Sequence, residues 1–133
     1  MKKSSVLDSF ALIAYLGRER GCESVRTLLH EAEASGDPLL MNEINVGEVY
    51  YLIAKERSIQ KAEEFLHRLE TLPIRLLANT FSQVLDAARL KAQFPVSYAD
   101  AFAIAAAIRE NARLVTGDPE LRSVAHLVDI LWI

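Results

Sequence analysis

Residues 4–16 read Ser-Ser-Val-Leu-Asp-Ser-Phe-Ala-Leu-Ile-Ala-Tyr-Leu, and this stretch decides the fold class. Residues 4–7 have the length and apolar character of a short buried strand. Residues 9–16 have the pattern of a helix, which Gly17 ends. A strand followed directly by a helix, with an acid at the junction, is typical of proteins in which helices connect parallel strands.

The same succession recurs along the rest of the chain. We predict helices over about 22–34, after Asn42 as N-cap, after Ser58, over about 80–93 and over about 98–111, and further strands over 39–41, 74–77, 114–116 and 127–131. Because short apolar strands alternate with helices throughout, we expect an α/β protein. Its architecture should be a three-layer α/β/α sandwich with a central, mainly parallel sheet, formed by a single domain over residues 1–133. In such folds ligands bind beyond the carboxyl ends of the strands.

Length and composition exclude several classes of protein. The chain has 133 residues, 51% of them apolar, with 15 Lys and Arg against 18 Asp and Glu, so the formal net charge is −3. One cysteine, Cys22, cannot form an intramolecular disulfide, and no Cys or His pair has zinc-finger spacing. We see neither a signal-peptide core nor a membrane-spanning apolar run, and therefore expect a cytoplasmic protein. The acidic balance argues against passive binding of nucleic acid through a basic surface.

Two acids follow predicted strands, and each could simply cap a helix. Asp8 comes directly after the first strand, where Asp is a favoured N-cap, although Ser9 could also serve. Asp118 lies in the loop after strand 114–116, and Pro119 after it suits the first position of a short helix. Taken alone, neither acid indicates more than a cap.

Two further acids lie near the apolar faces of predicted helices. Glu48 lies four residues from both Ile44 and Leu52, which places it on or beside the core-facing stripe, unless a helix starting at Asn45 makes it part of a capping box. Asp100 fits a capping box with Ser97, yet apolar residues three and four positions later point it toward a crevice. Four carboxylates converging on one crevice would repel each other unless a cation lay among them. Ligands that are all oxygen suit Mg²⁺ or Mn²⁺ better than zinc.

Four segments of the chain, in this order, resemble the PIN-domain ribonucleases, and most closely the VapC-type toxins of prokaryotic toxin–antitoxin pairs. They are Ser5–Leu16, Asn45–Val49, Ser97–Ala101 and Thr116–Glu120. The resemblance implies a metal-dependent endoribonuclease in which the acidic quartet is Asp8, Glu48, Asp100 and Asp118, with Ser9 and Thr116 as polar neighbours. It also implies a homodimer, inhibited by a VapB-type antitoxin whose tail occupies the groove. The chain departs from the family in having Ser9 where Thr is frequent, and in lacking an aromatic residue soon after the last acid.

Our main hypothesis is therefore that the quartet holds Mg²⁺ or Mn²⁺ for RNA phosphodiester hydrolysis. Without the four acids, 15 basic residues face 14 acidic ones, so a metal-loaded groove could attract RNA. Candidates for a basic edge of the groove, which could equally be solvated surface residues, are Arg18, Arg20, Lys55 and Arg57. We expect His30, His67 and His126 at the surface or the edge of the core, with no catalytic role.

Two other classes of function stay open at this point. A Mg²⁺-binding receiver module also places an Asp at a strand end, but it usually needs a second acid near the first strand and a Lys after a late strand. A catalytically silent interaction domain is the third possibility. The alanine-rich face formed by Ala99, Ala103, Ala106 and Ala107 could pack against another subunit, or equally be buried within the chain.

Overall fold

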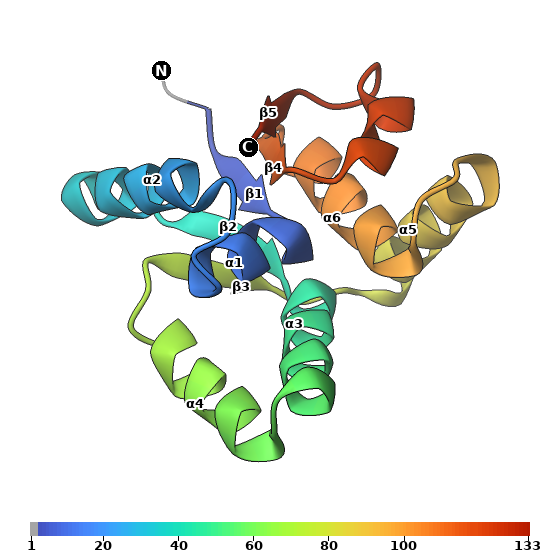
Figure 1. The fold of residues 1–133 in the computed structure, drawn as a ribbon. Helices are drawn as coiled ribbons and strands as arrows, with labels where there is room; N and C mark the ends of the chain where they lie inside the picture. The colour runs from blue at the N-terminus through green and yellow to red at the C-terminus, as the bar shows by residue number, and fades with distance from the viewer. Residues whose placement is uncertain (1–2) are drawn as a thin grey trace.

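A five-stranded sheet forms the centre of the computed structural model, which describes residues 3–133 (Figure 1). All strand pairs are parallel, in the order β3-β2-β1-β4-β5. The strands are β1 (Ser5–Leu7), β2 (Leu39–Asn42), β3 (Ile74–Leu77), β4 (Arg113–Thr116) and β5 (Ile130–Trp132). The chain builds the sheet from β1 outward in one direction, and then crosses back to place β4 on the other side of β1. The ends of β1 and β4 therefore form the topological switch point, where open parallel sheets bind their ligands.

Helices cover both faces of this sheet, so the predicted three-layer α/β/α architecture is confirmed. One face carries α1 (Ser9–Leu16), α2 (Cys22–Ser35), α3 (Glu43–Glu56) and α4 (Ile59–Leu69), and the other carries α5 (Phe81–Gln93), α6 (Tyr98–Arg109) and the 3₁₀ helix η1 (Pro119–Val124). Among the residues that the structure describes, none of these helices has both the length and the apolar character needed to cross a bilayer.

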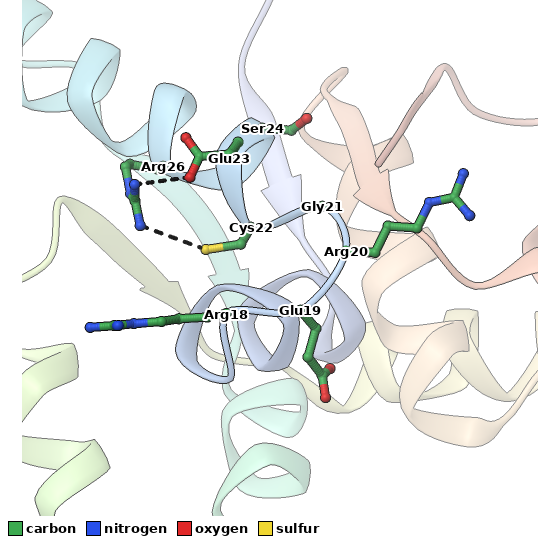
Figure 2. A pocket seen from close by; sticks show the side chains of 8 residues that line it. All are labelled: Arg18, Glu19, Arg20, Gly21, Cys22, Glu23, Ser24 and Arg26. Atoms are coloured by element: carbon green, nitrogen blue, oxygen red, sulfur yellow. Dashed lines mark hydrogen bonds and ion pairs between the residues drawn. The ribbon is translucent and has the colours of Figure 1, made fainter.

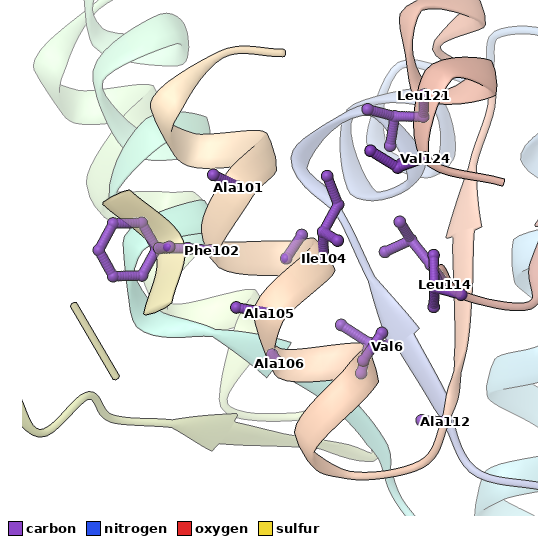
Figure 3. Packing of buried hydrophobic residues seen from close by; sticks show 14 of the residues in the cluster. Val6, Ala101, Phe102, Ile104, Ala105, Ala106, Ala112, Leu114, Leu121 and Val124 are labelled. Carbon is purple, nitrogen blue, oxygen red and sulfur yellow. The ribbon is translucent and has the colours of Figure 1, made fainter. Parts of the chain in front are cut away.

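The alternation of side chains along each strand divides the core into two layers. Val6 and Leu114 pack with α6 and η1 on one face (Figure 3), whereas Leu7 and Val115 pack with α1 to α4 on the other. This follows from the period of two along a strand, and it explains why the central strands β1, β2 and β4 read as apolar runs. A strand buried on both faces has no solvent-facing side to carry polar residues, except at its ends.

The alanine-rich helix α6 is buried within this chain. Ala103 and Ala106 have no exposed surface, and Ala107 is buried almost as completely. Small side chains let α6 lie close to β1 and β4 and bring its first turn to the carboxyl ends of these strands. Packing within the chain thus accounts for these three alanines without a second subunit.

The predicted bounds of the last strand are wrong, and the other predicted ends agree with the structure to within two residues. The last strand covers Ile130–Trp132 rather than 127–131, because η1 continues into a turn in which the Leu127 N–H donates to the Val124 carbonyl. His126 therefore lies in that turn, exposed beside the Phe94 ring, and does not begin a strand. The helix carrying Glu48 begins after Asn42, so the capping box starting at Asn45 does not form.

Candidate active site

Asp8 and Asp118 lie at the switch point, and both serve as helix caps. Asp8 Oδ1 accepts a hydrogen bond from the Ala11 N–H at 2.8 Å at the start of α1, and Asp118 Oδ1 accepts one from the Glu120 N–H at 2.9 Å at the start of η1. The Asp8 N–H donates to the Val115 carbonyl, which ties the ends of β1 and β4 together. The capping interpretation is therefore correct for both acids. Each cap uses only one of the two carboxylate oxygens.

Asp100 and Glu48 approach the same edge from helices α6 and α3. Asp100 lies in the first turn of α6 and is only 8% exposed. It forms the expected capping box, in which Asp100 Oδ2 accepts from the Ser97 N–H and Ser97 Oγ accepts from the Asp100 N–H. Glu48 is half-buried on α3, beside the buried stripe that contains Asn45 and Val49.

The charges of Asp100 and Asp118 act on Asp8, and the charges of Asp118 and Glu48 act on Asp100, so the fold brings these acids within range of one another's charge. The pKa of Asp8 is raised to about 7, chiefly by burial. The Thr116 hydroxyl and the Ala11 N–H oppose this rise, and the charges of Asp100 and Asp118 contribute to it. Burial also raises the pKa of Asp100, and the charges of Asp118 and Glu48 add to this rise. Carboxylates that raise each other's pKa form a site that is short of positive charge.

One oxygen of the Asp8 carboxylate is a place in this site where a positive charge could bind. Asp8 Oδ2 is fully buried and has no hydrogen-bond partner among residues 3–133, although the Thr116 hydroxyl lies near enough to the carboxylate to lower its pKa. Thr116 Oγ1 instead accepts from the Asp118 N–H at 3.0 Å and so fixes the loop that carries Asp118. Buried carboxylates without partners are rare in proteins unless they bind a ligand.

A fifth acid, Glu120, belongs to the same cluster and was not assigned from the sequence. One carboxylate oxygen from each of Asp100, Asp118 and Glu120 lies within 4.8 Å of the other two. The cap at the start of η1 turns the chain so that Glu120, two residues after Asp118, faces the site. Three convergent oxygens are the chemistry that hard divalent cations bind. The sequence carried the signal, an acid two positions from a candidate ligand, but only the tight turn of η1 makes it a neighbour.

Comparison with known families decides the assignment. Residues 5–127 match the PIN domain. The chain belongs to the PIN domain family. A comparison with curated proteins finds no match for the chain.

Solved structures of VapC-containing complexes and toxins share the whole PIN fold with this chain at low sequence identity. VapBC2 from Rickettsia felis, bound to a promoter DNA fragment, superposes with a TM-score of 0.72 at 15% identity, covering 97% of this chain and 98% of that one. DNA-bound VapBC from Salmonella typhimurium superposes with a TM-score of 0.74 at 14% sequence identity, and the match covers 98% of each chain. VapC20 from Mycobacterium tuberculosis, a toxin that cleaves the sarcin-ricin loop, superposes with a TM-score of 0.72 at 18% sequence identity. The match covers 95% of this chain and 98% of VapC20.

The four basic residues proposed for the edge of the groove, and the three histidines, are all exposed. Arg18 and Arg20 line a pocket of about 360 Å³ at the start of α2 (Figure 2), together with Arg26, which bonds Glu23 and approaches Cys22 Sγ. None of the four acids lines this pocket, which carries charges of both signs. Exposed side chains are also found at Lys55, Arg57, His30, His67 and His126.

The PIN site is closely packed at Gly117, against which the half-exposed Phe10 ring lies. A methyl group added to Gly117 would overlap the edge of the Phe10 ring at Cε1. We expect Gly117→Ala to displace the ring and to lower the free energy of unfolding by about 1 kcal/mol. Gly47→Ala is the control, because that position in α3 is open among the described residues, and we expect it to raise the same quantity by about 0.5 kcal/mol. Urea denaturation measures both, and equal shifts in the two variants would contradict the prediction.

Proposed function

We propose that this PIN-domain protein is a Mg²⁺- or Mn²⁺-dependent endoribonuclease and the toxin of a VapBC-type toxin–antitoxin pair. The observation that carries the proposal is the unpartnered buried oxygen of Asp8, which lies among three further acids at the switch point of the sheet. A protein with no ligand at this edge would gain stability by replacing Asp8 with a neutral residue. The site therefore has the features of a cation centre.

The residues present fit a divalent cation. Asp8 Oδ2 is free of hydrogen bonds among the described residues, and Asp118 and Glu120 place oxygens beside that of Asp100. We assign the four predicted acids, Asp8, Glu48, Asp100 and Asp118, as the groups that hold the ion, and add Glu120 at the rim. A divalent cation bound there supplies positive charge to the scissile phosphate and makes water more acidic near it.

The protein's own residues have two tasks in this reaction. The first is to hold the carboxylates in fixed positions before the substrate arrives, which the caps at Asp8, Asp100 and Asp118 achieve through backbone N–H groups. The second is to orient the attacking water, for which half-buried Glu48 is available, because the helix caps occupy one oxygen of each of the other three acids. No catalytic histidine is required, in agreement with the exposure of His30, His67 and His126.

RNA, a VapB-type antitoxin and a second copy of this chain are the partners we propose. The likeness in fold to structures that contain VapC with VapB, and to a toxin that cleaves the sarcin-ricin loop, supports the first two. The dimer rests on the family resemblance. A receiver-like module is a weaker alternative, because Val6 and Leu7 rather than an acid precede Asp8 and residues 114–118 contain no Lys. A silent interaction domain is weaker because it does not account for the unpartnered buried oxygen of Asp8.

The experiment that tests the proposal measures cleavage of a mixed pool of structured and single-stranded RNA by the purified, antitoxin-free protein. We expect cleavage with Mg²⁺ or Mn²⁺, none in EDTA, and full recovery when Mn²⁺ is returned in excess. Binding of Mn²⁺ is followed by calorimetry on the same preparation. Uptake of phosphate from a phosphodonor without cleavage would favour the receiver, and neither cleavage nor cation binding would favour the interaction domain.

A further inference from the structure

Asn45 is a fully buried polar side chain beside the candidate site, and it makes contacts with two other helices. Its side-chain Nδ2 donates to Ser9 Oγ at 3.2 Å and to the Ala99 backbone carbonyl at 3.1 Å. The backbone carbonyl of Asn45 accepts a hydrogen bond from the Ser9 hydroxyl at 3.3 Å. Ser9 and Ala99 lie 36 and 54 residues away from it in the sequence. A single amide thus joins the first turns of α1, α3 and α6.

The orientation of this amide is fixed by its partners. The Ala99 carbonyl can only accept, so the NH₂ group must face it. The Ser9 hydroxyl donates its hydrogen bond to the backbone carbonyl of Asn45, so its oxygen is free to accept one from Asn45 Nδ2. The two residues thus form a reciprocal pair of hydrogen bonds. The Ser9 hydroxyl is consequently committed to Asn45, which defines its role as a polar neighbour of the quartet.

The contacts of Asn45 all lead to residues adjacent to acids of the site. Ser9 follows Asp8 directly, Ala99 precedes Asp100, and Glu48 lies one helical turn after Asn45 itself. Three of the four acids therefore sit on backbone segments whose separation depends on one side chain. The fourth, Asp118, is held separately through Thr116.

Packing alone does not explain an asparagine at this position. Asn45 Oδ1 is buried and has no hydrogen-bond partner among residues 3–133, which costs free energy that an apolar side chain of similar shape would not lose. We therefore attribute the amide at this position to the two hydrogen bonds of its NH₂ group, which join α3 to α1 and to α6. Outer groups that orient ligands of a metal site have this role elsewhere in proteins.

We propose that Asn45 is a positioning residue, which sets the distances among Asp8, Glu48 and Asp100 by joining α1, α3 and α6 through its side-chain amide. The inference rests on the proposed cation site and identifies a residue that does not touch the ion. Asn45 acts on two elements at once, because both hydrogens of its NH₂ group are used.

The test compares cation affinity with stability in variants of the full chain. We expect Asn45→Leu to keep or raise the free energy of unfolding in EDTA, and to lower Mn²⁺ affinity, measured by calorimetry, by roughly 10- to 100-fold. Asn45→Ala and Ser9→Ala should lower the affinity as well, and the double variant should lose no more than Asn45→Ala alone, because the two residues act as a unit. Asn79→Ala is the matched control. It removes a partly buried amide pair, between Asn42 and Asn79, and should cost stability without changing Mn²⁺ affinity.

Each outcome separates the two ideas. If the wild-type protein binds Mn²⁺ and all Asn45 and Ser9 variants bind it equally well, Asn45 has no positioning role, and the cation site stands. If the wild-type protein binds no Mn²⁺, the proposed function fails and this inference fails with it. Should Asn45→Leu not fold, Ser9→Ala removes the same link from the side of α1, and an unchanged affinity there overturns the proposal.

Discussion

Asp100→Asn is expected to lower the rate of Mn²⁺-dependent RNA cleavage by at least about 100-fold. The substitution removes one negative charge from a site where charges of Asp118 and Glu48 already act on it. It leaves the fold intact, because an Asn oxygen can still accept from the Ser97 N–H and the backbone half of the capping box is unchanged. The loss should therefore appear as a fall in cation affinity and in kcat, with a urea midpoint in EDTA no lower than that of the wild-type protein, because burial also disfavours the charge of Asp100.

The matched control for this variant is Asp86→Asn. Asp86 is an exposed acid on α5 that pairs with Arg89, so removing its charge changes the net charge equally without touching the site. We expect the control to cleave at the wild-type rate. Cleavage that survives Asp100→Asn at full rate would mean that it comes from a contaminating nuclease or from another site.

Asp8→Asn is expected to have opposite effects on stability and on activity. Asp8 has a pKa of about 7 in the folded protein against 3.8 for the free side chain, because burial disfavours its charge. Between these two pH values the folded state binds more protons than the unfolded state, so the free energy of unfolding falls as pH rises. The difference between these two pKa values corresponds to a loss of roughly 4 kcal/mol in the free energy of unfolding by pH 8, when no cation is bound. Asn carries no charge, and its oxygen can keep the bond from the Ala11 N–H.

Urea denaturation in EDTA from pH 4 to pH 8 measures this effect. The variant should be the more stable protein at pH 8, by up to about 4 kcal/mol, with the difference shrinking toward zero near pH 4, where both side chains are neutral. In saturating Mn²⁺ the wild-type protein should gain stability and the variant should not, and the variant should not cleave RNA. A variant less stable than wild type at pH 8 in EDTA would show that Asp8 is already neutralised by another group.

The sequence alone predicted the layers of the fold and most element ends, for reasons that can be named. The sequence marks these elements locally, by short apolar runs for the strands and by Gly17, Pro73 and Pro95 after the helices. Such local patterns predict elements without knowledge of contacts between distant residues. The positions of Asp8 and Asp118 at strand ends also followed from sequence order, because parallel strands bring their carboxyl ends to one edge. The mutual effects on pKa are consistent with the predicted convergence of all four acids.

The remaining features depend on contacts between distant segments and could not be predicted. Nothing near Asn45 indicates that its amide faces Ser9 and Ala99, and the motif around it pointed instead to a capping box. Glu120 reads as a surface acid until η1 turns it toward Asp100. The late start of β5 reflects the turn after η1, which the apolar run Leu127–Leu131 conceals.

The strand order has a consequence for when activity can first appear during synthesis. Residues that reach the site early, Asp8 and Glu48, must wait for Asp100 and Asp118, and β4 enters the sheet between β1 and β5 only after three strands have already been made. On the proposed function, a chain still growing on the ribosome cannot complete its site, and so cannot cleave RNA, before β4 has been made and has joined β1.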